Sequence, residues 1–405
     1  MRFVVQKFGG TSLATPELRE KSANKIVDCL KAGYYPVVVV SAMGRKGDPY
    51  ATDTLLSLFF PLEFVPSRER DLLMSCGEII SGVLMAATLR QKGYPAVFLT
   101  GGQSGIITNG DYTEARILRV NPERIIDQAR DGKIIVVAGF QGVSEEGEIT
   151  TLGRGGSDTT AAALGVALNA ACIEIFTDVD GIMKADPRIV GDSTPLEKVT
   201  YNEICQLAQE GAKVIHPRAV EIAMQKNIPI WVKPIFSDAP GTLITSHTEI
   251  FRDVTDITSD RLITGITYIQ NITQINIEID NPDLCNPSKI FRPLADAGIS
   301  VDLINVNPHL IAFTVKDEVA VKAENILKEI GFEPQCLPGC AKIALVGAGM
   351  TGIPGVMAGI VEALDKNGIT ILQSADSYTT IWVLVKQEDK DKAIRALFHQ
   401  FKLGD

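Results

Sequence analysis

The chain has 405 residues, of which 45% are hydrophobic and 22% are charged, and its formal net charge is −10. This length and composition are typical of a soluble globular protein with two or three domains. The negative charge argues against general nucleic-acid binding, and no apolar run approaches the length of about 20 residues that crosses a bilayer, so we expect no membrane segment.

The N-terminus and the cysteines indicate the cytoplasm. Residues 1–10 lead directly into a strand-like run and lack the longer apolar stretch of a signal peptide. The seven cysteines are widely scattered, which suits a reducing compartment better than a disulfide framework. Cys336 and Cys340 form the only close pair, and because no histidine is near them we do not expect a zinc site.

The first half of the chain alternates strands and helices. Residues 3–6 and 36–40 are typical of buried strands, and between them Thr15 caps a helix that Gly33 ends. A long helix is expected at 68–90. Further strands are expected at 96–100, 134–138, 173–177, 228–232 and 242–244. This order predicts a mainly parallel sheet, with ligands bound outside the carboxyl ends of the strands.

Polar and glycine-rich residues follow the first two strands. Lys7, Gly9 and Gly10 come at the end of the first strand, and Ser41 at the end of the second. The position of Lys7 between a buried strand and a Gly-Gly turn favours contact with a phosphate, although a surface lysine at a strand end would also fit.

Residues 150–160 combine small residues with one cation and one carboxylate before a helix. Gly155 and Gly156 allow a ligand to approach the backbone, and Ser157 or Asp158 can cap the helix. Arg154 adds a planar guanidinium suited to carboxylate or phosphate. The segment therefore predicts an anion site, with a tight turn beside a surface arginine as the alternative.

Two further polar residues have competing interpretations. Glu78 lies in the apolar part of the helix expected at 68–90, so it either occupies a solvated face or meets a cation; spacing alone favours the solvated face. His216 is one of four isolated histidines and is better explained as a structural hydrogen-bonding residue than as a base.

Five motifs occur together in one order, and together they resemble the aspartate kinase (aspartokinase) family. They are Lys7–Ser12, Ser75–Glu78, Gly153–Asp158, Phe176–Gly181 with Asp186–Arg188, and Gly211–Val214. The resemblance covers essentially the whole chain. It is to monofunctional bacterial members of Bacillus type, which include a diaminopimelate-sensitive enzyme.

The resemblance implies phosphoryl transfer from ATP with Mg²⁺ to the β-carboxylate of L-aspartate, which gives 4-phospho-L-aspartate. It places the chain at the first step of lysine, diaminopimelate, threonine and methionine biosynthesis. This chemistry fits the residues, because a carboxylate with a pKa near about 4 is already ionised at neutral pH and needs no general base. Catalysis then depends on positioning and on stabilisation of the phosphoryl charge.

The resemblance also implies roles for individual residues. Lys7 would stabilise the transferring phosphoryl group, and Asp158 would orient Lys7 and help to fix the substrate amine. Arg154 would bind the α-carboxylate of aspartate, and Glu78 its α-ammonium. Ser41, Thr52, Gly155, Gly156 and Ser157 would add substrate contacts. The ATP site would comprise Lys7, Phe8, Gly9, Gly10, Ser157, Thr177, Asp178, Met183, Arg188, Lys213 and Val214, with Met183 replacing a tyrosine common in relatives.

The second half contains an internal repeat. Residues 297–301 match 367–371, and strands at 309–315 and 379–385 precede helices at 319–330 and 389–400, all at an offset of about 70 residues. The repeat resembles two ferredoxin-like ACT domains, which implies a homo-oligomer and an amino-acid effector, either lysine, threonine or diaminopimelate. The expected effector residues are Ile299, Val301, Asp302, Asn305, Val306, Ser374, Ala375 and Asp376.

A dinucleotide-like Gly-x-Gly-x-x-Gly pattern lies at 347–352. Only 53 residues follow it, which is too few for a doubly wound sheet, and the repeat already accounts for the segment. We therefore expect these glycines to shape a strand–helix loop near the effector pocket.

The predicted fold class is a three-layer αβα kinase domain with a mainly parallel sheet, of the carbamate-kinase-like type, followed by two α+β ACT domains. The predicted ranges are 1–245 for the catalytic domain, 246–261 for a linker, and 262–337 and 338–405 for the ACT domains. The alternatives are another acylphosphate-forming amino-acid kinase, such as one acting on glutamate, and an amino-acid sensor with an inert kinase half.

Overall fold

The chain divides into two units, which we describe separately. A computed structural model describes residues 1–59, 62–212, 214–246, 262–279, 287–347, 350 and 353–404. The first unit comprises the described residues within Met1–Ile182, Pro195–Ala208 and Lys213–Ile257, and the second those within Met183–Thr194, Gln209–Ala212 and Thr258–Asp405. Two segments that we placed in the catalytic domain, 183–194 and 209–212, thus belong to the second unit, and the domain ranges above remain predictions.

The first unit is built on an eight-stranded sheet of order β10-β12-β11-β9-β1-β2-β6-β3, in which only the β11–β12 pair is antiparallel. Its strands are β1 (Phe3–Phe8), β2 (Tyr35–Val40), β3 (Ala96–Leu99), β6 (Ile134–Ala138), β9 (Cys172–Thr177), β10 (Lys198–Thr200), β11 (Ile230–Pro234) and β12 (Thr242–Thr245). The expected parallel sheet is confirmed.

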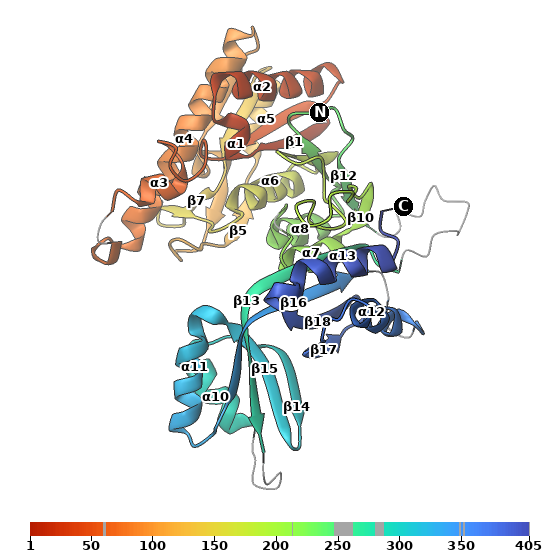
Figure 1. Cartoon of the computed structure of the whole chain (residues 1–405). Helices are drawn as coiled ribbons and strands as arrows, with labels where there is room; N and C mark the ends of the chain where they lie inside the picture. The colour runs from red at the N-terminus through yellow and green to blue at the C-terminus, as the bar shows by residue number, and fades with distance from the viewer. Residues whose placement is uncertain are drawn as a thin grey trace. The chain divides into compact units, whose positions relative to one another are not determined.

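Helices cover both faces of this sheet (Figure 1). They are α1 (Gly10–Leu13), α2 (Pro16–Lys31), α3 (Thr52–Leu56), α4 (Ser67–Gln91), α5 (Glu123–Arg130), α6 (Gly156–Ala167), α7 (Tyr201–Gln209) and α8 (Pro217–Met224), with 3-10 turns at Leu62–Phe64 and Gly102–Ser104. Phe8 points into the apolar core beneath α2 and α4, whereas the adjacent Lys7 points to α6. Successive strand residues face opposite sides of the sheet, and helices pack against both sides. The first unit therefore has a three-layer αβα architecture.

The ends of α2 form as the sequence predicts. The Thr15 side chain accepts a hydrogen bond from the Leu18 N–H, Pro16 occupies the first turn, and Gly33 follows the helix at a φ of +83°. These residues satisfy the helix end and give the chain a left-handed turn before β2.

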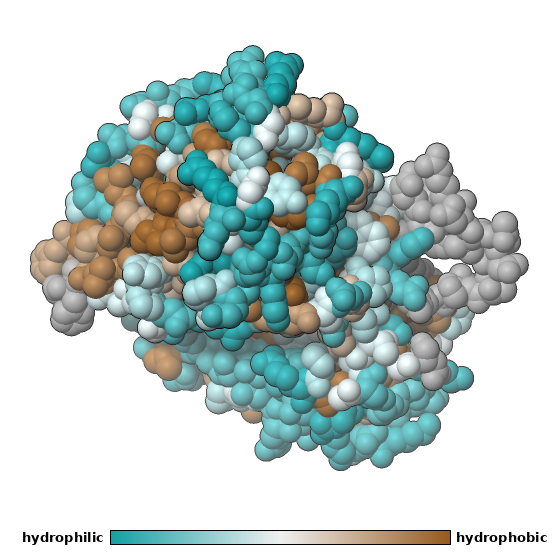
Figure 2. All heavy atoms as spheres, turned by 90° about the horizontal axis from the view of Figure 1, so that it is seen from above, coloured by the Kyte–Doolittle hydropathy of each residue, from teal (hydrophilic) through white to brown (hydrophobic). Residues whose placement is uncertain are grey.

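Helix α4 corrects the expectation about apolar runs. Among the helices of the described residues, α4 alone is long and apolar enough to cross a membrane, by length and composition. Half of the apolar window is buried inside the unit, where Met85 and Leu89 join the core and Asp71 and Glu78 are also buried. Its apolar character is therefore explained by packing on the sheet. Exposed apolar side chains, including Leu58, Phe64 and Val83, gather over α3 and α4 (Figure 2).

A second, smaller sheet of the first unit was not predicted. It has the order β5-β4-β7-β8 and consists of β4 (Ile106–Thr108), β5 (Ile117–Val120), β7 (Gln141–Ser144) and β8 (Ile149–Thr151). Strand β8 ends three residues before Arg154, and α4 packs against it. This sheet therefore positions the glycine loop that contains Arg154.

The second unit contains a six-stranded antiparallel sheet of order β14-β15-β13-β16-β18-β17. Its elements are β13 (Gly265–Glu278), α10 (Ser288–Asp296), β14 (Asp302–Asn307), β15 (Leu310–Lys316), α11 (Asp317–Glu329), β16 (Gln335–Val346), α12 (Val356–Asp365), β17 (Gln373–Asp376), β18 (Thr380–Lys386), a 3-10 turn at Gln387–Asp389, and α13 (Lys390–Gln400). The strands β15 and β18 are offset by 70 residues, as the repeat predicts.

The two repeats share their central strands. The first half of β13 pairs with Ala341–Val346 of β16, and its second half pairs with β15 and with the first part of β16. Each ferredoxin-like module therefore takes a part of both long strands. Of the Gly-x-Gly-x-x-Gly pattern, Ala348, Gly349, Thr351 and Gly352 lie outside the described residues; β16 precedes the pattern and α12 follows it, as expected.

Candidate active site

The carboxyl edge of the large sheet brings several of the predicted site residues together. Lys7 is paired in register with Val39 of β2 and Ile175 of β9, and Phe8 with Val40 and Phe176. Lys7, Ser41 and Thr177 therefore lie on adjacent strands at one edge, as the parallel topology requires.

Lys7 forms an ion pair across the edge. Its Nζ lies 2.8 Å from Asp158 Oδ1 in the first turn of α6, and the two side chains are only 14% and 12% exposed. Helix α6 approaches β1 closely because it is built of small residues such as Ala161 and Ala162. The pair therefore holds one fixed cation at the carboxyl edge, as we expected from the family resemblance.

The glycine loop is tightly packed at the start of α6. Gly155 has a φ of +68°, and a Cβ there would lie 2.3 Å from the side chain of His216. A Cβ on Gly156 would lie 2.7 Å from Phe140. His216 itself caps α8 by accepting a hydrogen bond from the Arg218 N–H, which supports its interpretation as a structural residue. The loop thus needs glycine, and the N–H groups of α6 begin directly behind Arg154.

Glu78 is buried, so the solvated face favoured by its spacing is wrong. The residue is 2% exposed, and its Oε1 accepts a hydrogen bond of 2.9 Å from the Ala42 N–H just beyond β2. Its Oε2 has no hydrogen-bond partner among the described residues. Burial raises the pKa of this carboxyl to about 8. Glu78 thus presents an unmatched acceptor close to the end of β2.

Arg154, Thr52 and Ser41 are the other residues that we predicted to contact the substrate. Arg154 is exposed, and within the described ranges its guanidinium has no ion pair. Thr52 is the first residue of α3. Ser41 continues β2 through a hydrogen bond from its N–H to the Phe8 carbonyl, and its own carbonyl accepts from Ser81 of α4. The structure thus places a free cation and small hydroxyls in the loops of this edge.

The residues expected at the ATP site fall into three groups. Gly9 and Gly10 lie where β1 turns into α1, and a Cβ on Gly10 would lie 2.5 Å from the Ala42 carbonyl. Asp178, which follows Thr177, is paired with Arg45 at 2.5 Å. The Phe8 ring is fully buried and stacked on Phe176, so it is turned away from any ligand at this edge.

The other residues predicted for the ATP site are Met183, Arg188, Lys213 and Val214. Val214 is half-buried in the first unit, and Lys213 lies outside the described residues. Met183 and Arg188 belong to the second unit, where Arg188 is paired with Asp186 and Tyr268 donates to the same carboxylate. The pair with Asp186 raises the pKa of Arg188. These two residues remain predictions for the nucleotide site.

Metal binding has no dedicated cage in the described part of the chain. No group of three or more histidine, cysteine, aspartate or glutamate side chains is placed there to hold an ion. A Mg²⁺ ion that travels with ATP does not need one, because such ions are bound mainly by phosphates, water and one or two carboxylates. The arrangement is therefore compatible with a metal–nucleotide substrate.

The predicted effector residues lie on both edge strands of the second unit. Asp302, Asn305 and Val306 are exposed on β14, and Ser374 and Asp376 are exposed on β17 with Ala375 half-buried between them. Val301 precedes β14, whereas Ile299 is buried in the core of the first module. The structure thus places all but Ile299 at accessible or half-buried positions.

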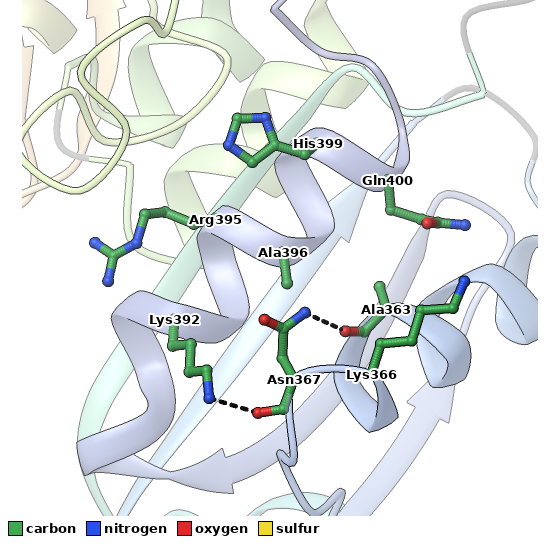
Figure 3. Close-up of a pocket in the computed structure, with 8 residues that line it drawn as sticks. All are labelled: Ala363, Lys366, Asn367, Lys392, Arg395, Ala396, His399 and Gln400. Atoms are coloured by element: carbon green, nitrogen blue, oxygen red, sulfur yellow. Dashed lines mark hydrogen bonds between the residues drawn. The ribbon is translucent and has the colours of Figure 1, made fainter.

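A cavity of about 470 Å³ in the second unit lies away from all predicted site residues. Cationic side chains of α12 and α13, with His399, line it (Figure 3). Lys392 donates to the Asn367 carbonyl at 2.6 Å, and Lys366 is the C-terminal cap of α12. Lys392 thus bonds a carbonyl just beyond α12 and Lys366 is paired with Glu362, so both lysines have partners within the unit.

Two charged residues near the site were missed by the sequence reasoning, Asp71 and Arg218. Asp71 is fully buried and accepts hydrogen bonds from Thr113 and Thr151, and Arg218 donates to the carbonyls of Leu152 and Ala115. A signal for Asp71 was present, because Asp71, Ser75 and Glu78 recur on one face of an otherwise apolar helix.

Comparisons with known proteins agree with this architecture. A profile of the amino acid kinase family matches residues 2–234, and a profile of the ACT domain matches residues 335–398. The chain is 48% identical to aspartokinase 1 of Bacillus subtilis over 100% of both chains, and 41% identical to an aspartokinase of Mycolicibacterium smegmatis over 100% of this chain and 97% of that one.

Solved structures give the same result. The structure of aspartate kinase from Clostridium acetobutylicum has a TM-score of 0.82 at 26% identity and covers 98% of this chain and 100% of that one. Aspartokinase III of E. coli, in complex with aspartate and ADP, has a TM-score of 0.76 at 24% identity and covers 98% and 99%. The latter likeness shows the fold alone.

Proposed function

We propose roles for the residues of the candidate active site, starting from the premise that the chain belongs to the amino acid kinase family, among its aspartokinases. As such it phosphorylates aspartate under allosteric control. The reaction transfers a phosphoryl group from ATP to the β-carboxylate of L-aspartate. That carboxylate is ionised at neutral pH, so the site has to position two anionic substrates and neutralise their charge.

Glu78 is the observation that carries the assignment of the acceptor site. A buried carboxylate with one unmatched oxygen needs a cation, and the α-ammonium of aspartate supplies one. The exposed guanidinium of Arg154 is suited to receive the α-carboxylate in a bidentate pair. Glu78 and Arg154 thus bind the two groups on the α-carbon, and the β-carboxylate extends toward Lys7, with Ser41 and Thr52 as further substrate contacts.

Lys7 stabilises the charge of the transferring phosphoryl group. Its ion pair with Asp158 fixes the ammonium at the sheet edge before the substrates arrive, so little reorganisation is needed during transfer. Gly155, Gly156 and Ser157 at the start of α6 offer backbone N–H groups to phosphate oxygens. Lys7 and the start of α6 therefore act on the phosphates from two directions.

The nucleotide occupies the loops after β1 and β9, with Gly9, Gly10, Thr177 and Asp178 as its contacts in the first unit. When bound with ATP, Mg²⁺ would supply positive charge to the phosphates. Asp178, which is paired with Arg45 and more exposed than Asp158, is a carboxylate of this edge that would be open to hydrated metal. Lys213 and Val214 complete the proposed ATP set of the first unit, whereas the buried ring of Phe8 is excluded from it.

The second unit binds the amino-acid effector at β14 and β17. Both strands lie at the ends of the six-stranded sheet, and the Gln373 side chain of β17 donates to the Leu303 carbonyl of β14, so the two edges lie together and can jointly face a second copy of the chain. We therefore assign the effector site and a homo-oligomer contact to these edges.

The proposed effector is lysine, threonine or diaminopimelate. The proposed reaction is the first step toward lysine, diaminopimelate, threonine and methionine, and the proposed compartment of the enzyme is the cytoplasm.

Trapping of the acyl phosphate tests the proposed function. With ATP, Mg²⁺, aspartate and hydroxylamine, we expect aspartyl hydroxamate; glutamate in place of aspartate tests the alternative kinase, and absence of both hydroxamates would support the inert sensor. Addition of each of the three amino acids identifies the effector.

The Arg154→Ala variant tests the acceptor site in the same assay. Loss of the guanidinium should raise the KM for aspartate by about 100-fold or more, while ATP binding is retained. Arg130→Ala on α5, whose partner Asp127 is equally exposed, is the control and should behave as the wild type. An unchanged aspartate KM in Arg154→Ala contradicts the assignment.

A further inference from the structure

The loop that carries Arg154 is held on one side by a buried carboxylate of α4. Asp71 Oδ2 accepts from the Thr151 N–H at 2.7 Å, and Asp71 Oδ1 accepts from the Thr151 hydroxyl at 2.7 Å. Both oxygens also receive the Thr113 N–H at 3.0 Å. Asp71 is 0% exposed, so without these hydrogen bonds its carboxylate would be buried without a partner.

A charged side chain of α8 holds the same segment from the other direction. Arg218 donates to the Leu152 carbonyl at 3.3 Å and to the Ala115 carbonyl at 3.1 Å. The Ala115 N–H in turn donates to the Thr151 carbonyl at 2.9 Å. The backbone of 151–152 is thus joined to that of 113–115, and one carboxylate and one guanidinium hold these two segments together.

Beyond this clamp the chain has little freedom. Leu152 donates from its N–H to the Phe140 carbonyl, and Gly155 is confined against the ring of His216. Arg154 lies between these two fixed points, while its own side chain is exposed. The position from which the guanidinium reaches a ligand is therefore set by its backbone, and the backbone is set by Asp71 and Arg218.

We infer that Asp71 and Arg218 are positioning residues that fix Arg154 relative to Glu78, and so set the spacing at which the site recognises an α-amino acid. Asp71 and Glu78 lie seven positions apart on α4, about two turns or 10.5 Å along one rigid helix. One carboxylate of this helix meets the ammonium, and the other holds the loop that meets the carboxylate. This inference rests on the roles proposed for Glu78 and Arg154.

The inference makes a specific prediction for substrate discrimination. In Asp71→Asn an amide N–H₂ replaces one acceptor and faces the N–H donors of Thr113 or Thr151, so the loop must shift. A misplacement of about 1 Å can cost roughly 100-fold, and we expect the aspartate KM to rise by about 10- to 100-fold with the ATP KM unchanged. The preference for aspartate over its α-amide, which lacks the α-carboxylate charge, should fall by a similar factor.

Three further variants separate positioning from a general loss of structure. Glu69→Gln, on the same helix but outside the clamp, is the matched control and should retain the wild-type preference. Thr151→Val removes only the hydroxyl that donates to Asp71, and it should lower the preference by a few-fold if Asp71→Asn folds poorly. Arg218→Lys keeps the charge but cannot bond both carbonyls, so it should act in the same direction.

A double-mutant cycle decides the mechanism. If Asp71 acts through Arg154, Asp71→Asn adds little to the aspartate KM of Arg154→Ala, whereas independent effects would multiply. Equal losses for aspartate and its α-amide in every folded variant, or independent effects in the cycle, overturn the inference. If Arg154→Ala alone leaves the aspartate KM unchanged, the proposed acceptor site fails instead, and the two failures are thereby distinguished.

Discussion

Two charged clusters, one in each unit, differ in whether the protein itself supplies their partners. In the first unit, Glu78 is left with one unmatched oxygen, and Arg154 is free of ion pairs within the described residues. In the second unit, Lys342 on β16 is 4% exposed and has two carboxylate partners, Glu210 at 2.9 Å and Asp302. Its ammonium also lies 5.9 Å from the centre of the Trp382 ring.

The difference separates a binding site from a structural ion cluster. Burial lowers the pKa of Lys342, but its hydrogen bonds to Asp302 and Glu210 outweigh burial and raise it, so the charge is kept by the protein itself. Burial of Glu78 raises its pKa, and only backbone hydrogen bonds, at Ala42 and at Glu78 itself, act in the opposite direction, so a ligand is needed to complete its charge. A buried charged group that lacks a partner within the protein therefore indicates a ligand site. Variants of each cluster test this comparison.

The largest expected effect is the loss of catalysis in Lys7→Ala. Removal of the cation that pairs with Asp158 should reduce kcat by about 1,000-fold, because a preorganised charge near the phosphoryl group is lost. The rate of ADP formation at saturating aspartate measures it. Lys25→Ala is the control, since Lys25 contacts only the fully exposed Asp238; equal rates in Lys7→Ala and wild type would refute the role.

In the second unit the corresponding change should affect stability instead of chemistry. Lys342→Met leaves Glu210 and Asp302 without their shared cation, and breaking a buried pair costs about 3–5 kcal/mol. Urea unfolding followed by tryptophan fluorescence, with Trp382 in this unit and Trp231 in the first, measures the shift. Lys328→Met, which breaks the exposed pair with Glu324, should cost about 0.5 kcal/mol or less. A kcat changed as strongly as in Lys7→Ala would remove the distinction between the clusters.

The unfinished charge of Glu78 should make aspartate binding depend on pH. With a free pKa of about 8, this carboxyl is largely protonated at pH 6, and binding of the ammonium favours the ionised form and releases a proton. The Kd for aspartate should therefore fall by up to about tenfold per pH unit between pH 6 and 8 and then level off. Calorimetry in buffers of different ionisation enthalpy counts the proton, and Glu78→Gln should remove both effects.

The smallest effects are expected at the edges of the second unit. Asn305→Ala on β14 and Ser374→Ala on β17 should raise the effector concentration for half-inhibition by several-fold while kcat stays unchanged, since both residues are exposed and lie outside the catalytic unit. Inhibition curves with lysine, threonine and diaminopimelate measure this. Unaltered inhibition in both variants would place the effector elsewhere.

The architecture was more accessible to sequence reasoning than the site. Buried strands, the Thr15 cap and the repeat offset are local patterns, and they predict the large sheet and both modules. The strands β4, β5, β7 and β8 have only three or four residues each, too few for a periodic signal. Residues 183–194 join the second unit through long-range packing, which no local pattern records.

The burial of Glu78 and the role of Asp71 could not be predicted from the sequence pattern. Helical spacing alone favours a solvated face for Glu78, because it does not show that α4 lies against Ala42, where a Cβ on Gly77 would be 2.6 Å from the Ala42 side chain. Only the motif resemblance suggested a ligand. Asp71 belongs to no such motif, and its partners Thr113 and Thr151 are 42 and 80 positions away, so its role became visible only in the fold.

The shared strands of the second unit have a consequence for how such regulatory regions can evolve. Because the first half of β13 completes the sheet of the later module while its second half belongs to the earlier one, the two modules are interleaved along the chain. Recombination that exchanged either module alone would leave the other with a missing strand and an open sheet edge. The pair can therefore be duplicated, transferred or fused to another catalytic unit only as one block.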